Sequence, residues 1–101
     1  MTQIKKIGLL DINESMEFMK LKEEFSKFME KIAAAGGEQA IYNTIKSKPF
    51  SAAILLNETE KMMRKISDAH SGYAKRDMYV AKELNQMNAK LATFRENIKT
   101  R

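Results

Sequence analysis

The sequence predicts an all-α fold, either a helical hairpin or a small bundle with a long, coiled-coil-like C-terminal helix. The chain has 101 residues but only one proline and four glycines, so few positions interrupt a helix. Apolar residues also recur at alternating spacings of three and four in both halves, which is the period of a helix that buries one face. Because cysteine is absent, the core must form without disulfides.

The first ten residues are predicted to form an N-terminal arm, and residues 11–101 a single helical domain. Ile4, Ile7, Leu9 and Leu10 alternate with lysines in the arm. This pattern is too short to distinguish a docked segment, a short strand and a disordered tail.

A first helix is predicted over residues 12–35. Asp11 and Glu14 match a capping box, in which each side chain binds the backbone of the other residue. Gly36 suits the left-handed residue that ends a helix. The apolar positions of this helix are Phe18, Leu21, Phe25, Phe28, Ile32 and Ala35.

A shorter helical stretch follows, with Ile41 and Ile45 on one side. Pro49 either ends this stretch or opens the next helix, because proline fits the first turn of a helix but not its interior.

From Ala52 onward, one heptad frame holds to the end of the chain and predicts a coiled-coil-like seam. One seam position holds Leu56, Met63, His70, Asp77, Leu84, Leu91 and Ile98. The other holds Ala52, Thr59, Ile66, Tyr73, Val80, Met87 and Phe94.

The stretch "DAHSGYAKRD" leaves two alternatives open at Gly72. Asp, Ser and Gly together favour a turn, and glycine inside a helix costs about 1 kcal/mol relative to alanine. The unbroken heptad phase and the lack of a capping residue before Tyr73 favour continuity, with a bend at most. We expect the continuous form, in which residues 51–99 make a helix about 70 Å long that the first helix, at about 36 Å, cannot cover.

The uncovered half of that long helix predicts the function. Its apolar seam would face water and would bind either further copies of the chain or another protein. We therefore expect a non-enzymatic structural or adaptor protein, either an assembly component or chaperone-like, that acts by helix-mediated oligomerisation or by binding a protein partner. The expected partner-binding residues are Leu84, Met87, Leu91, Phe94 and Ile98.

Three polar residues occupy this seam. His70, Tyr73 and Asp77 follow one another at spacings of three and four, which places them on one face of a continuous helix. Polar residues in a seam often fix the register and the oligomeric state, so we interpret the three as a polar register layer.

The charge distribution supports one alternative, a nucleic-acid-binding accessory protein. Residues 61–101 hold 10 basic and 4 acidic residues, a net charge of +6, whereas residues 1–60 hold 8 and 9, a net charge of −1. Such a basic half can contact phosphates, and Lys75, Arg76 and Lys82 are the candidate anion contacts. A further alternative is a small helical inhibitor or immunity factor, for which the sequence offers no marker.

The sequence does not indicate catalysis or the binding of a metal or cofactor. We expect no catalytic residue, no metal site and no cofactor, because the chain has a single histidine, no cysteine and no phosphate-binding glycine motif. No apolar run approaches the length of a membrane span, and the cysteine-free composition fits a reducing compartment, so a cytoplasmic location is expected.

Overall fold

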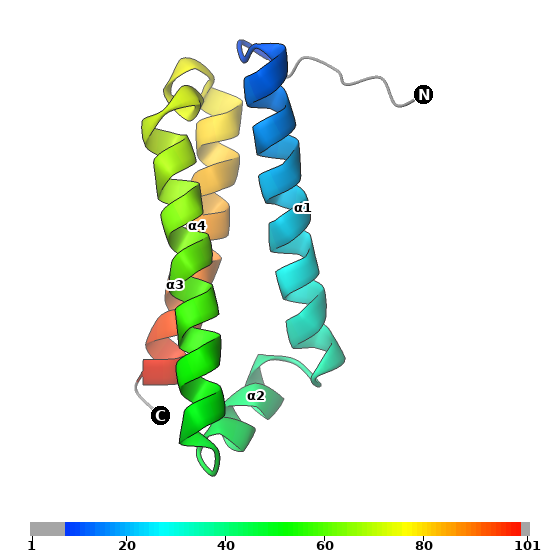
Figure 1. The fold of residues 1–101 in the computed structure, drawn as a ribbon, viewed down its shortest axis with the longest axis vertical. Coiled ribbons are helices and arrows are strands. Elements are labelled where there is room, and N and C mark those ends of the chain that lie inside the picture. The colour runs from blue at the N-terminus through cyan, green and yellow to red at the C-terminus, as the bar shows by residue number, and fades with distance from the viewer. Residues whose placement is uncertain (1–7, 100–101) are drawn as a thin grey trace.

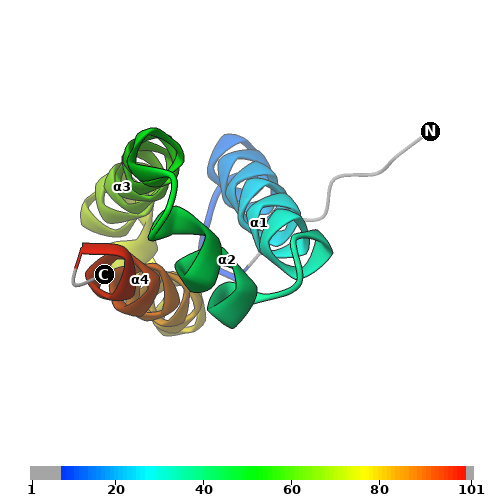
Figure 2. The same cartoon turned by 90° about the horizontal axis from the view of Figure 1, so that it is seen from below.

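The structure, a computed structural model, describes residues 8–99 and confirms the all-α class. These residues contain no strand. The α-helices are α1 (Ile12–Ala34), α2 (Glu38–Ile45), α3 (Pro49–Ser71) and α4 (Met78–Lys99), and a 3₁₀ turn, η1 (Tyr73–Arg76), precedes α4. The three long helices lie side by side, while α2 crosses one end of the molecule (Figures 1 and 2).

Local signals set both ends of α1 as predicted. Glu14 N–H donates to Asp11 Oδ1 at 2.7 Å, and Asp11 N–H donates to Glu14 Oε1 at 3.0 Å, which completes the capping box. At the other end Gly36 has a φ of +100°, a conformation that a side chain would disfavour. Gly37 N–H then donates to the carbonyl oxygen of Ile32 at 3.0 Å, and this bond closes the last turn.

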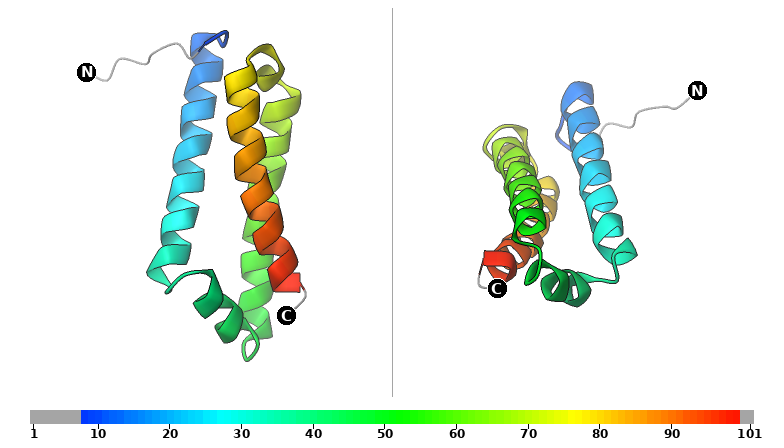
Figure 3. Two further views of the ribbon diagram at one scale, coloured as in Figure 1. Left: turned by 180° about the vertical axis from the view of Figure 1, so that it is seen from behind. Right: turned by 60° about the horizontal axis from the view of Figure 1, so that its bottom comes forward.

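The short helix α2 carries Tyr42 and Ile45 on its buried side. Pro49 stands at the first helical position of α3, so the chain uses it to open a helix. Viewed from behind, α2 links the end of α1 to the start of α3 across the bottom of the molecule (Figure 3).

The continuous helix expected through Gly72 is wrong. Helix α3 ends at Ser71, the chain reverses through η1, and α4 packs antiparallel along α3 (Figure 1). The longest dimension of the structure is 46 Å, which is too short for a helix of about 70 Å. The second helix begins later than Tyr73 and is capped by Asp77, whose Oδ1 accepts the N–H groups of Tyr79 (2.9 Å) and Val80 (3.3 Å).

Residues 73–76 connect α3 to α4. They form a 3₁₀ turn, and both Tyr73 and Ala74 are buried. The turn therefore contributes side chains to the core, and this burial helps to hold the reversal in place.

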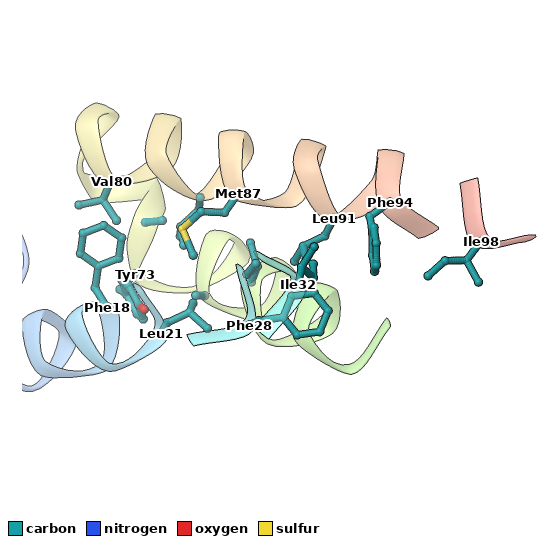
Figure 4. Packing of buried hydrophobic residues seen from close by; sticks show 14 of the residues in the cluster. Phe18, Leu21, Phe28, Ile32, Tyr73, Val80, Met87, Leu91, Phe94 and Ile98 are labelled. Carbon is teal, nitrogen blue, oxygen red and sulfur yellow. The ribbon is translucent and has the colours of Figure 1, made fainter. Parts of the chain in front are cut away.

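The expectation that the C-terminal seam faces water is also wrong. Leu84, Leu91 and Phe94 have no exposed surface. Side chains of α1 and α3 cover them: the ring of Phe28 meets Phe94 edge-on at 6.1 Å, and the labelled side chains of α4 all project toward the other helices (Figure 4). One molecule thus closes its own core, because α3 and α4 fold together instead of extending end to end.

Candidate functional site

The predicted partner-binding residues lie in the core. All five belong to the inner face of α4, where they are buried within the chain. In this structure they hold the fold together and present no surface to a partner. The residues are Leu84, Met87, Leu91, Phe94 and Ile98.

The polar trio does not form a layer on one helix. His70 lies in the last turn of α3, Tyr73 in η1, and Asp77 before α4. The register layer was predicted for a continuous helix. Because α3 ends at Ser71, the interpretation as a register layer is wrong. Burial raises the pKa of Tyr73 to about 12, and the negative charges of Glu17 and Glu14 add to the effect.

The candidate anion contacts differ in their surroundings. Arg76 Nη1 donates to both carboxylate oxygens of Glu14, at 2.9 and 2.8 Å, so its charge already has an intrachain partner. Lys75 in η1 and Lys82 on α4 are exposed. Their contribution to anion binding stays a prediction.

The predicted N-terminal arm lies partly within the described chain. Leu10 is fully buried, and Leu9 N–H donates to Asp77 Oδ2 at 2.9 Å. This end of the arm is therefore docked against the start of α4. Residues 1–7 of the arm lie outside the described residues.

Sequence reasoning missed a hollow of about 300 Å³ where α1, α2 and α3 meet. Three elements contribute its walls, and the walls are largely apolar. The apolar lining residues are Phe28, Ile32, Ala35, Ile41, Ile45, Ile54 and Leu55. Thr44, Ser51, Lys31 and Glu58 supply the polar lining atoms.

Two exposed apolar side chains extend this surface along α3. Phe50 is 79% exposed, and Ile54, one turn further on, is 48% exposed. Ile54 lines the hollow, and Phe50 lies one turn before it on the same helix. An apolar patch beside such a hollow is typical of a surface that binds another protein.

A second hollow of about 380 Å³ continues the first along the line between α1 and α3. Phe28, Lys31 and Glu58 belong to the walls of both, so the two hollows are adjacent, and the ion pair of Lys31 with Glu58 stands at their boundary. We call the two hollows together the α1–α3 groove. The second hollow is lined by Glu24, Lys27, Phe28, Lys31, Glu58, Lys61, Met62 and Lys65.

Two ion pairs cross the groove between its walls. Lys31 Nζ lies 3.1 Å from Glu58 Oε2, and Lys65 Nζ lies 3.3 Å from Glu24 Oε2. All four side chains are partly exposed, so each pair stabilises the fold by about 1 kcal/mol at most. The pairs position the lysines at the rim and neutralise both glutamates of the groove.

Signals for the groove in the sequence were faint. The spacing of Ile41 and Ile45 marked one wall, and Phe50 and Ile54 are likewise four residues apart. What brings these residues to Phe28 is the turn of the chain through α2, which no local pattern encodes.

Neither a cluster of metal ligands nor similarity to other proteins identifies the role of the site. Within the described part of the chain, no three histidine, aspartate or glutamate side chains gather where they could hold a metal ion. None of its helices is both long and apolar enough to cross a membrane. No family model, curated protein or solved structure matches the sequence or the fold.

Proposed function

We propose that the protein is a non-enzymatic adaptor that binds a partner protein through the α1–α3 groove. The observation that carries the proposal is the contrast between a closed core and an open apolar hollow. The seam of α4 is sealed inside the molecule, whereas the hollow lined by Phe28, Ile41 and Ile54 is open to a partner side chain. Apolar area in a concave site is where binding energy concentrates in protein interfaces.

The polar groups of the hollow support binding more than catalysis. The Thr44 hydroxyl donates to the carbonyl oxygen of Ala40 at 2.9 Å, and Lys31 is paired with Glu58. These groups are committed to the fold, and none pairs a nucleophile with a base. The groove therefore offers shape and apolar surface rather than a reacting centre.

Self-association through the C-terminal seam is not part of this proposal. Self-association was expected because the C-terminal seam seemed uncovered, and the covered seam removes that reason. A different protein is the favoured partner, and a cytoplasmic setting remains part of the proposal on the basis of the cysteine-free sequence.

Site-specific photo-crosslinking tests the proposal. A benzophenone amino acid at Ile54 should crosslink one defined partner in the native host, whereas the same probe at Asn85, exposed on α4, should not. The purified partner should then bind the wild-type chain and lose affinity for Ile54→Glu. Equal labelling from Asn85, or full affinity of Ile54→Glu, would contradict the groove as the binding surface. Duplex DNA offered to both proteins tests the nucleic-acid alternative.

A further inference from the structure

The proposal that the groove binds a protein leaves open what kind of segment occupies it. We infer that the occupant is an acidic amphipathic helix of the partner, whose apolar side chains enter the hollow and whose carboxylates meet the lysines of the rim. The inference rests on the proposed function and adds the chemistry of the partner.

The shape of the groove fits a helix. Its α1 wall runs from Glu24 to Ala35, and its α3 wall runs from Ser51 to Lys65, in the opposite direction. Eleven residue steps along α1 amount to about 17 Å, or three helical turns. The described walls are helical and offer no strand edge to which an extended peptide could add. A helix lying over the ion pairs would present anchors at successive turns to the two hollows.

The end of the groove where α1, α2 and α3 meet provides the anchor site. The hollow of about 300 Å³ is at the small end of the range for ligand pockets, so it suits one or two large apolar side chains. Ile54 belongs to its lining and is 48% exposed, and Phe50 lies one turn before it on α3. Such an arrangement places the main energetic contact at one end of the docked helix.

The rim of the groove is positively charged. Four lysines and two glutamates line the two hollows, and both glutamates are paired with lysines. A third lining lysine, Lys27, is paired with Glu23 at 3.3 Å. Lys61 is the lining lysine that has no carboxylate partner among the described residues. A carboxylate on a docked segment would pair with Lys61, whereas a lysine there would be repelled.

A second copy of the chain is a poorer occupant on the same ground. The whole chain carries a net charge of +5, so two copies repel each other. Seating a different part of one copy in the groove of the next would also give an open-ended assembly, because such a contact is not closed by two-fold symmetry.

Two designed helical peptides of about 14 residues test the inference. Both carry the same leucine, isoleucine and phenylalanine anchors, and they differ only in having glutamates or lysines beside the anchors. Fluorescence anisotropy with the wild-type chain should show the glutamate peptide binding at least about tenfold more tightly at low salt. The difference should shrink as salt screens the rim.

Variants of the chain separate the two contributions. Ile54→Glu should abolish binding of the glutamate peptide, and Lys61→Glu combined with Lys27→Glu should remove its advantage over the lysine peptide. The matched control, Lys82→Glu on the outer face of α4, should change neither result. Far-ultraviolet circular dichroism of each variant confirms that it folds.

The outcomes distinguish this inference from the proposed function. Equal affinity for the two peptides, or equal binding of a glutamate peptide whose anchors are replaced by serine, would overturn the acidic amphipathic helix. If crosslinking from Ile54 still identified a partner, the groove would remain the binding surface. Self-association that is lost in Ile54→Glu, measured by sedimentation without peptide, would instead identify a second copy as the occupant.

Discussion

Leu9 and Asp77 are hydrogen-bonded across 68 positions of the sequence: the backbone N–H of Leu9 donates to Asp77 Oδ2 at 2.9 Å. The other oxygen of the same carboxylate caps α4. Beside it, Arg76 binds Glu14 in the first turn of α1. The start of α1 is thereby fastened to the turn that reverses the chain, so the two features should lose stability together.

Substitution of Gly8 should show this coupling. Gly8 has a φ of +49°, and a Cβ atom there would overlap Oδ2 of Asp77. We expect Gly8→Ala to lower the free energy of unfolding by about 1 kcal/mol or more, partly from backbone strain and partly from the displaced carboxylate. In an Asp77→Ala background the loss should be smaller. Urea denaturation of the four proteins in this double-mutant cycle measures the difference, and strictly additive losses would contradict the coupling.

Acid should weaken the same contact. The pKa of Asp77 lies below its ordinary value of 3.8, chiefly because the backbone N–H of Leu9 donates to its carboxylate. The N–H groups of Val80 and Tyr79 lower it further. Because the pKa is lower in the folded state, the stabilisation is present above about pH 4 and is lost as the pH falls through the folded-state value. Asp77→Asn should therefore lose less stability than the wild type between pH 5 and pH 2.5, as followed by thermal denaturation. Parallel curves for the two proteins would refute this.

Alkaline pH should reveal the burial of Tyr73. Its pKa is raised to about 12 from 10.0, so the unfolded chain releases the phenolic proton more readily than the folded chain. This contribution to stability is complete below about pH 10 and declines as the pH rises toward 12. The pKa of Tyr79 is raised as well, by its interaction with Glu83, so the titration is compared in a Tyr79→Phe background. There, the absorbance of tyrosinate should lose one late-titrating group when Tyr73 is replaced by Phe, and this second substitution should also reduce the loss of stability over this range. An unchanged number of late-titrating groups after Tyr73→Phe would disprove the assignment.

Truncations should separate the core from the groove. Leu91 is fully buried, so Leu91→Ala should lower the free energy of unfolding by about 2–5 kcal/mol. Ile54 is about half exposed on the groove, so Ile54→Ala should cost only about 0.5–1 kcal/mol. Chemical denaturation measures both. If Leu91→Ala left stability intact, the seam would be a surface, as first expected from the sequence.

Elements with local signals could be predicted from the sequence. The capping box at Asp11 and the glycine pair after Ala35 define both ends of α1, because each acts on its own helical turn. Pro49 marked the start of α3 for the same reason. In these cases the residues that determine an end lie within a few positions of it.

The reversal at Gly72 could not be predicted in this way. Ile66, Tyr73 and Val80 keep one heptad phase although they lie on three elements, because each of those elements turns an apolar side into the same core. Phase alone therefore could not distinguish one long helix from two that fold together. The groove was missed because its walls come from α1, α2 and α3, and only the tertiary fold brings Phe28 near Ile54.

A distance between α3 and α4 tests most directly whether the chain closes its own core. Spin labels at Asn57 and Thr93, both exposed, would be about 54 Å apart on one continuous helix. In the folded pair the helix axes are about 10 Å apart, so we predict a distance below about 30 Å by double electron–electron resonance. Labelled chains diluted into unlabelled protein keep the measurement within one molecule. A distance near 54 Å under those conditions would contradict the closed core, and with it the groove as the surface left for a partner.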